Sequence, residues 1–189
     1  DFTPPKYINS IDTPLFHKGR MLYGAAHANY AAREGDPVIV TEGYMDVIAC
    51  WQAGLRGAVA PLGTALTEDQ ILEMWRMIPD DTKIPILCFD GDNAGRRAAM
   101  RAAERALPLL KAGHSLKFMF LPDGEDPDTY IRQKGTNAFK VLLNQAEPLV
   151  EFLFQQEIQE RLLETPEERA GLNTRLEDYV KRIPDRDVQ

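Results

Sequence analysis

The sequence predicts an α/β protein, with a mostly parallel sheet flanked by helices and an all-helical C-terminal appendage. Short apolar runs of strand length alternate with helix-length segments between residues 38 and 121, a pattern typical of parallel sheets. Beyond Pro122 the periodicity is only helical. Several apolar runs are followed directly by acidic residues, and the carboxyl ends of strands are where such sheets bind ligands.

The composition is typical of a water-soluble globular chain. The 189 residues are 44% hydrophobic and 27% charged, enough for one α/β domain with an appendage. The net charge of −7 argues against a non-specific nucleic-acid binder, which is usually basic. No apolar run approaches the 18 residues of a membrane span, so we expect no membrane partner. Because the first residues are Asp1-Phe2-Thr3 without Met, we expect the chain to belong to a longer protein.

The N-terminal part is expected to lead from an irregular segment into the sheet. Residues 1–18 contain three prolines, and residues 19–33 predict a helix that ends before Gly35 and Pro37. The expected strands are 38–41, 58–60, 84–89 and 116–121. The helices between them are expected at 44–52, 67–78 and 93–112, the second begun by a capping box of Thr67 and Gln70.

The C-terminal part is expected to be helical throughout. Its four helices are predicted at 128–134, 137–145, 148–163 and 166–182, where Pro148 and Pro166 suit first helical turns. Cys50, Cys88, Trp51, Trp75, Met74, Met77, Phe152 and Phe154 are predicted to lie in the core. We expect both cysteines to be reduced, as in a cytoplasmic protein.

Asp90-Gly91-Asp92 is the most informative stretch of the sequence. Two carboxylates stand where an apolar strand ends and a helix begins, and such close carboxylates usually need a cation or a proton between them. On its own, the stretch is more often an Asp/Gly turn with solvated side chains.

Acidic residues also follow the carboxyl ends of other predicted strands. Glu42 follows the first strand, with Asp46 one turn into the next helix, and Asp126 and Asp128 follow the fourth. If these strands are neighbours, the carboxylates converge, and one or two Mg²⁺ ions would relieve their repulsion and bind phosphate oxygens. The alternative is that Asp92 and Asp126 only cap their own helices, and capping and metal binding are compatible.

The basic residues allow two interpretations. Arg97, Arg101 and Arg105 share one helix face, which either follows a DNA backbone or, more commonly, is simply solvated. Arg96 is nearer to the acidic residues and a better candidate for a phosphate contact.

The sequence resembles the TOPRIM family in two segments, Glu42-Gly43-Tyr44-Met45-Asp46-Val47 and Phe89-Asp90-Gly91-Asp92-Asn93-Ala94-Gly95. Three further segments resemble the bacterial replicative DNA primases of the DnaG type over nearly the whole chain. They are Phe16-His17-Lys18-Gly19-Arg20, Leu62-Gly63-Thr64 and residues 118–128.

The primase resemblance implies a fold and a division of the chain. It implies a TOPRIM-type sheet domain at residues 37–128, between a connecting segment with a helix at 1–36 and a helical subdomain at 129–189. The family's zinc-binding domain and helicase-binding domain are not expected within this sequence. Zinc is therefore not expected here, and activity of the chain alone is in doubt.

The resemblance also implies an activity and its residues. The implied reaction is synthesis of short RNA primers from NTPs on single-stranded DNA, with Mg²⁺ or Mn²⁺ and more than one ion. Glu42, Asp90 and Asp92 match the central acids, and Asp46, Asp126 and Asp128 the supporting metal ligands. Lys6, Asn9 and Lys18 match nucleotide-binding positions, with Arg20 and Arg96 as further phosphate or DNA contacts.

Some alternatives stay open at this point. Glu42 is either a metal ligand or a general base. A TOPRIM nuclease or topoisomerase fragment, or a non-catalytic DNA-binding module, would share the fold. The retention of all six carboxylates argues against the non-catalytic module.

Overall fold

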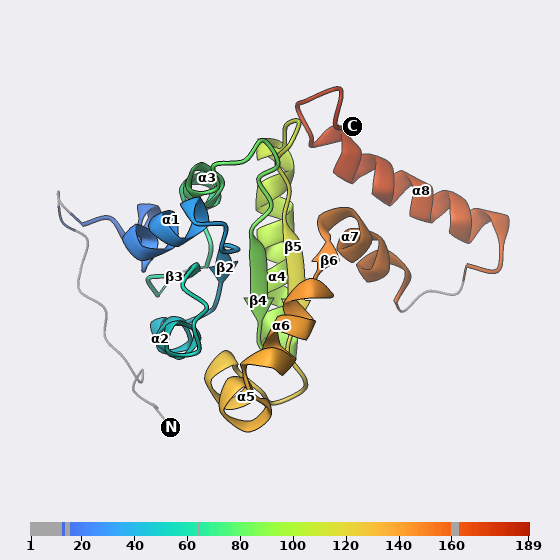
Figure 1. Ribbon diagram of the computed structural model, residues 1–189. Coiled ribbons are helices and arrows are strands. Elements are labelled where there is room, and N and C mark those ends of the chain that lie inside the picture. Colours follow the sequence, from blue (N-terminus) through green and yellow to red (C-terminus); the bar gives the residue numbers. More distant parts are fainter. Residues whose placement is uncertain (1–12, 14–15, 64, 160–162) are drawn as a thin grey trace.

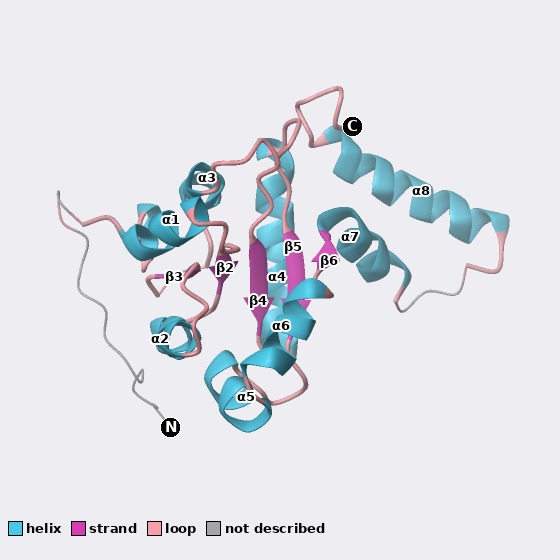
Figure 2. Ribbon diagram, viewed as in Figure 1, coloured by secondary structure: helices cyan, strands magenta, loops and turns pink. Residues whose placement is uncertain are grey.

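A mixed sheet forms the centre of the molecule (Figures 1 and 2). The computed structural model describes residue 13 and residues 16–63, 65–159 and 163–189. The strands in these residues are Leu22–Tyr23 (β1), Ile39–Val40 (β2), Ala58–Pro61 (β3), Ile86–Phe89 (β4), Lys117–Phe120 (β5) and Glu147–Pro148 (β6). Their order is β1-β3-β2-β4-β5-β6.

The four central strands are parallel, as the sequence predicted. β3, β2, β4 and β5 pair in parallel, and both edge strands, β1 and β6, are antiparallel. Neither edge strand was predicted. β6 contradicts the expectation of purely helical structure after Pro122, because two residues are too few for a visible alternation in sequence. Glu147 and Pro148 are held by pairing with Phe118 and Lys117 of β5.

The helices agree with prediction except near the N-terminus and at some ends. They are Lys18–Arg20 (η1, 3₁₀), Ala25–Arg33 (α1), Tyr44–Gln52 (α2), Glu68–Met77 (α3), Asn93–Ala106 (α4), Leu107–Leu109 (η2, 3₁₀), Pro127–Lys134 (α5), Thr136–Asn144 (α6), Leu149–Ile158 (α7) and Pro166–Lys181 (α8). The capping box of Thr67 and Gln70 before α3 is confirmed. None of the described helices is long and apolar enough to span a membrane.

The predicted helix over residues 19–33 is wrong in its first half. Leu22–Tyr23 instead pairs with β3, and α1 begins only after Gly24. Gly24 has a φ of 84°, and a side chain there would collide with the ring of Trp51. The backbone therefore turns at Gly24, and local helix propensity gives way to sheet pairing.

Two layers of side chains fill the space on the two faces of the sheet. Val40 and Leu87 belong to the cluster with α1, α3, α4 and α7. Ile39 and Cys88, their neighbours along the strands, belong to the cluster with α2 and α6. The alternation follows from the two-residue period of a strand, and each face is covered by helices.

Most of the predicted core residues are buried. Cys50 and Cys88 are free thiols in the core, and Met74, Trp75, Met77 and Phe152 are also buried. Trp51 is only half-buried, with its indole N–H donating to the Ala58 carbonyl at 3.2 Å. The prediction for Phe154 was wrong, since 37% of this residue is exposed on α7.

The predicted division of the chain stays a prediction. The sheet takes β1 from the segment assigned to 1–36 and β6 from the segment assigned to 129–189. Both neighbouring segments therefore contribute an edge strand to the sheet.

Candidate active site at the carboxyl edge of the sheet

The predicted carboxylates follow three neighbouring parallel strands. β2, β4 and β5 are adjacent, so their carboxyl ends meet at one edge of the sheet. Glu42 lies just beyond β2, Asp90 directly after β4, and Asp126 in the loop beyond β5. We call the set of six residues the acidic edge: Glu42, Asp46, Asp90, Asp92, Asp126 and Asp128.

Burial and mutual repulsion raise the pKa values of two of these carboxylates. Burial, followed by the charge of Glu42, raises the pKa of Asp90 to about 7, and Asp46, Asp126 and Asp92 add to the rise. Burial and then Asp126 raise the pKa of Asp46 to about 6, although the Gly43 amide opposes the change. Glu42 and Asp128 contribute to the rise at Asp46 as well. The charges of the other acidic-edge residues therefore act on Asp90 and Asp46, and the assignment of the six residues to one site stays a prediction.

Backbone amides bind two carboxylates of the acidic edge. The Asp90 amide donates to Glu42 Oε1 at 3.2 Å, which connects the loop after β4 to the loop after β2. The Gly43 amide donates to Asp46 Oδ2 at 3.2 Å. Glu42 is exposed, and its bond to the Asp90 amide is made by Oε1.

Asp92 and Asp126 are helix caps, as the alternative interpretation predicted. Asp92 Oδ1 accepts from the Gly95 amide at 2.7 Å, and Asp126 Oδ1 accepts from the Thr129 amide at 2.7 Å. Each cap occupies one carboxylate oxygen and fixes the direction of the other. Asp128 is ion-paired with Arg132 at 2.5 Å.

The donor set fits Mg²⁺ better than an ion that needs a closed cage. Within the described residues, no three His, Cys, Asp or Glu side chains already stand as a metal-holding group. Mg²⁺ keeps several waters and binds through one or two carboxylates, whereas structural zinc sites are complete protein cages. Carboxylate oxygens, which the acidic edge supplies, are the donors that suit Mg²⁺.

Gly91 lets the Asp90–Asp92 loop lie directly against the end of β5. A Cβ at this position would overlap the carbonyl oxygens of Leu121 and Pro122. The glycine therefore permits a close approach of the loops that carry Asp90 and Asp126, and so helps to bring their carboxylates together.

The predicted basic residues that the structure describes lie in η1 and α4. Lys18 lies in η1, where its carbonyl accepts from Gln70 Nε2 at 2.9 Å, at the N-terminal end of α3. Arg20 is ion-paired with Asp69 at 3.1 Å, and the Arg96 guanidinium lies 5.3 Å from the ring centroid of Phe120. Lys6 and Asn9, like Thr64 of the Leu62-Gly63-Thr64 motif, lie outside the described residues.

A cavity beside Glu42 was not predicted. It has a volume of about 240 Å³ and includes Arg101 and Arg105 in its lining. Their helical spacing was visible in the sequence, but a solvated face was the preferred interpretation. The neighbours of Arg101 across the cavity belong to the loop after β3 and to β2, so only the tertiary structure could reveal the site.

Comparison with known protein families identifies the type of domain that the sheet forms. Residues 36–120 match the Toprim domain family, in agreement with the parallel sheet and its acidic edge. The protein is thus a Toprim-domain protein. Its sequence is 48% identical to the DNA primases of Pseudomonas aeruginosa and of Escherichia coli K12, in each case over 95% of this chain.

Solved structures agree over almost the whole chain. A DNA primase domain from P. aeruginosa matches with a TM-score of 0.90 at 46% identity, covering 98% of this chain and 57% of that one. The E. coli primase catalytic core matches with a TM-score of 0.87 at 46% identity, covering 98% and 58%. The chain belongs to the DnaG-type DNA primases. It spans 27% and 30% of the length of the two curated relatives.

Proposed function

We propose that this chain provides the metal-binding part of a primase catalytic core, which makes short RNA primers on single-stranded DNA during replication. The acidic edge is the main support, because six interacting carboxylates at adjacent strand ends are suited to phosphoryl chemistry with metal ions. Similarity to primases over 95% of the chain favours this activity over a topoisomerase or nuclease. One similar structure is a DnaG catalytic domain bound to single-stranded DNA.

In the proposed reaction a ribose 3′-hydroxyl attacks the α-phosphate of an NTP and releases pyrophosphate. Bound Mg²⁺ or Mn²⁺, in more than one ion, would lower the hydroxyl's pKa and neutralise phosphate charge. Asp90, Asp92, Asp126 and Asp128 would hold the ions directly or through water, with support from Asp46. Glu42 has one oxygen on the Asp90 amide, so the other is left to bind metal or to accept the proton.

The remaining contacts are assigned to the basic residues and to other parts of the protein. Lys6, Asn9 and Lys18 would bind the triphosphate or the primer end, and Arg20 and Arg96 would contact phosphates. Zinc binding and helicase binding would belong to domains outside this sequence, as the name of an Aquifex aeolicus structure with separate zinc-binding and RNA polymerase domains suggests. A cytoplasmic location at the replication fork would follow.

The test is primer synthesis by a primase catalytic core that contains this chain. Mutation of a residue that only supports a metal ligand typically lowers metal affinity or activity about 10–100-fold. Since Asp90 is assigned to hold the metal itself, Asp90→Asn should lower the rate of RNA synthesis by roughly 100-fold or more. Asp123→Asn is the matched control, because Asp123 is exposed on the same side of the fold without a contribution to the pKa of Asp90. A wild-type rate for Asp90→Asn would contradict the proposal.

A further inference from the structure

Tyr30 stands on the exposed face of α1, between two hollows in the surface. It is 65% exposed although its ring is large and apolar. The residue lines both hollows, each with a volume of about 370 Å³. The first hollow extends over His27 and Trp51 to Arg56, and the second extends to Arg33. Tyr30 therefore separates two accessible spaces, each with an arginine in its lining.

The first hollow has a wall of aromatic rings. The ring centroids of His27 and Trp51 are 4.8 Å apart, and the Trp51 indole N–H donates to the Ala58 carbonyl at 3.2 Å. Ala26 and Ala31 complete the lining on the α1 side, and their small side chains leave room for a flat group. Aromatic rings prefer offset or edge-to-face contacts with other rings, so the hollow suits a flat aromatic molecule.

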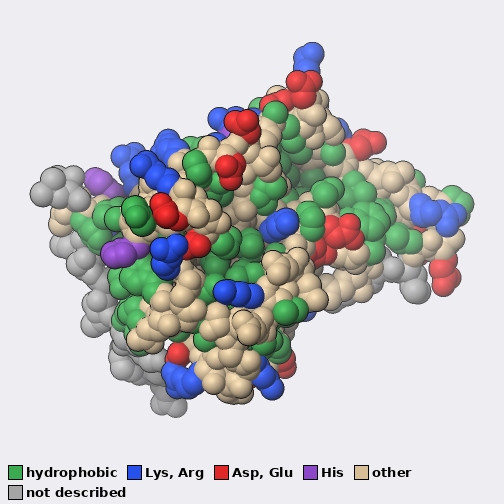
Figure 3. Space-filling view, viewed as in Figure 1, with side chains coloured by type: hydrophobic (Ala, Val, Ile, Leu, Met, Phe, Trp, Pro, Cys, Tyr) green, Lys and Arg blue, Asp and Glu red, His purple; other side chains and the backbone are tan. Residues whose placement is uncertain are grey.

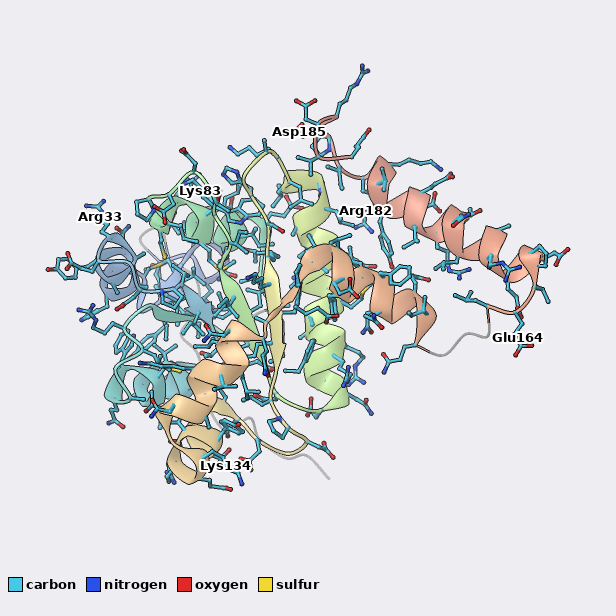
Figure 4. All side chains as sticks on the ribbon, turned by 45° about the vertical axis from the view of Figure 1, so that its right-hand side comes forward. Arg33, Lys83, Lys134, Glu164, Arg182 and Asp185 are labelled. Atoms are coloured by element: carbon cyan, nitrogen blue, oxygen red, sulfur yellow. The ribbon has the colours of Figure 1, made fainter. Side chains whose placement is uncertain are left out.

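The arginines of the two hollows have donors available for an anion. Arg56 donates through Nε to Asp36 at 2.8 Å, and its two terminal nitrogens carry the other donors of the guanidinium. Arg33 projects from α1 (Figure 4), and within the described residues no ion pair or hydrogen bond engages its side chain. Glu73, the acid that lines the second hollow, is ion-paired with Arg76 at 3.1 Å. Each hollow therefore combines an aromatic surface with a cation.

A row of aromatic rings connects the first hollow with the acidic edge. The centroids of Trp51 and Tyr23 are 5.8 Å apart, and so are those of Tyr23 and Tyr44. Tyr44 is the first residue of α2 and follows Glu42 and Gly43. The first hollow is therefore three ring contacts away from the loop that carries Glu42. A single strand that reaches the acidic edge can reach the hollow within a few nucleotides.

We propose that Tyr30, with His27 beside it, is a stacking site for unpaired bases of the single-stranded DNA template. Arg33 and Arg56 bind the adjoining phosphates. The inference rests on the proposed function, which supplies the template. Proteins that bind single strands combine aromatic side chains, on which bases stack, with basic residues that follow the backbone. Because the site is separate from the acidic edge, the base that stacks here is not the one being copied.

The test compares two oligonucleotides of about 12 units, one of thymidines and one abasic, which share their sugars and phosphates. Their binding to a primase catalytic core that contains this chain is measured by fluorescence anisotropy. Tyr30→Ala should weaken binding of the thymidine probe about tenfold, the loss typical of one stacked base, and leave the abasic probe unchanged. Tyr30→Phe is the matched control, because it keeps the ring, and should bind both probes as the wild type does.

A second variant tests the phosphate contact. Arg33→Ala should weaken binding of both probes and lower the slope of log affinity against log salt concentration by about 1, whereas Tyr30→Ala should leave this slope unchanged. Unchanged thymidine binding by Tyr30→Ala, or equal losses for the two probes, would overturn the inference alone, since primer synthesis by the wild-type core tests the proposed function separately. Failure of the wild-type core to bind the thymidine probe would overturn the proposed function too.

Discussion

At the scale of single residues, four carboxylates of the acidic edge also hold the backbone in place. Asp92 and Asp126 cap helices, Glu42 joins two loops, and Asp46 accepts from the Gly43 amide. These bonds fix one oxygen of each of these four groups, and their partners are neutral backbone amides. Asp90 has the highest pKa of the acids with a resolved shift, because it is partly buried among the others. The fold thus bears electrostatic repulsion that a bound cation would relieve.

This repulsion predicts how stability depends on pH in the absence of metal. Asp90 ionises near pH 3.8 in the unfolded chain but only near pH 7 in the folded one, so the folded state binds more protons between these values. Stability should therefore fall as the pH rises from about 4 to about 7. Asp90→Asn should reduce the fall by roughly 1 kcal/mol, or about 2–4 °C in Tm, because partial exposure screens the charge.

The measurement is thermal unfolding at pH 5 and pH 8 in EDTA. Asp123→Asn is the control and should keep the wild-type difference between the two pH values. Adding Mg²⁺ at pH 8 should raise the Tm of the wild-type chain and raise that of Asp90→Asn less. A difference in Tm that is identical for wild type and Asp90→Asn would contradict the electrostatic account.

At the scale of helices and strands, close packing at the carboxyl edge decides where each loop runs. α4 begins against the loop after β4, and a Cβ at Gly95 would overlap the carbonyl oxygen of Asp90. Gly95 is buried within α4, where alanine would otherwise be the better helix former. The glycine is thus required by the contact between the helix start and the strand end, and this contact sets the position of Asp90 and Asp92.

Two glycine-to-alanine substitutions separate packing from helix propensity. Gly95→Ala should destabilise the chain by roughly 1–3 kcal/mol, because the steric overlap outweighs the gain in propensity. Gly171→Ala in α8 should stabilise it by roughly 0.5–1 kcal/mol, because only the flexible end of Arg175 lies near its Cβ position. Urea unfolding of both variants measures the two effects. Stabilisation by Gly95→Ala would show that the helix start can move away from Asp90.

At the scale of the whole molecule, α8 extends away from the sheet (Figure 1), whereas α7 packs against the sheet. Glu157 of α7 accepts from Arg175 at 2.6 Å and from the Tyr179 hydroxyl at 2.9 Å. At the other end of α8, Arg182 donates to the Glu104 carbonyl and Asp185 accepts from the Ala112 amide (Figure 4). Polar contacts therefore hold α8 at several points.

The space between these helices and the sheet is incompletely filled. A groove of about 490 Å³ lies among Leu153, Phe154 and Tyr179, and hydrophobic side chains lie open on the surface beside α7 and α8 (Figure 3). Val150 and Val180 are 75% and 39% exposed. Since little apolar surface is buried here, we expect α8 to open more readily than the sheet.

Removal of the Glu157 contacts should therefore loosen α8 selectively. Glu157→Ala is expected to speed amide hydrogen exchange in α8 by roughly tenfold or more, because a partly buried charged hydrogen bond contributes about 1.5–3 kcal/mol. Exchange in β4 and β5 should stay unchanged. Glu151→Ala serves as the control, because Glu151 is exposed and, among the described residues, its hydrogen bond is with Gln155 on its own helix. Equal acceleration in α8 and β4 would show that the two unfold together.

The sequence by itself determined the central strands, most helices and the buried cysteines, because these depend on local periodicity and on turn and cap chemistry. Its assignment of six acidic residues to one site stays a prediction. It missed β1 and β6, which are too short to show a pattern and exist only through pairing. Only the tertiary structure decided that Glu42 hydrogen-bonds the Asp90 backbone and that Arg101 lines a cavity beside it. The physical reason is that strand order and loop packing, which bring residues 42, 90 and 101 together, arise from contacts distant in the chain.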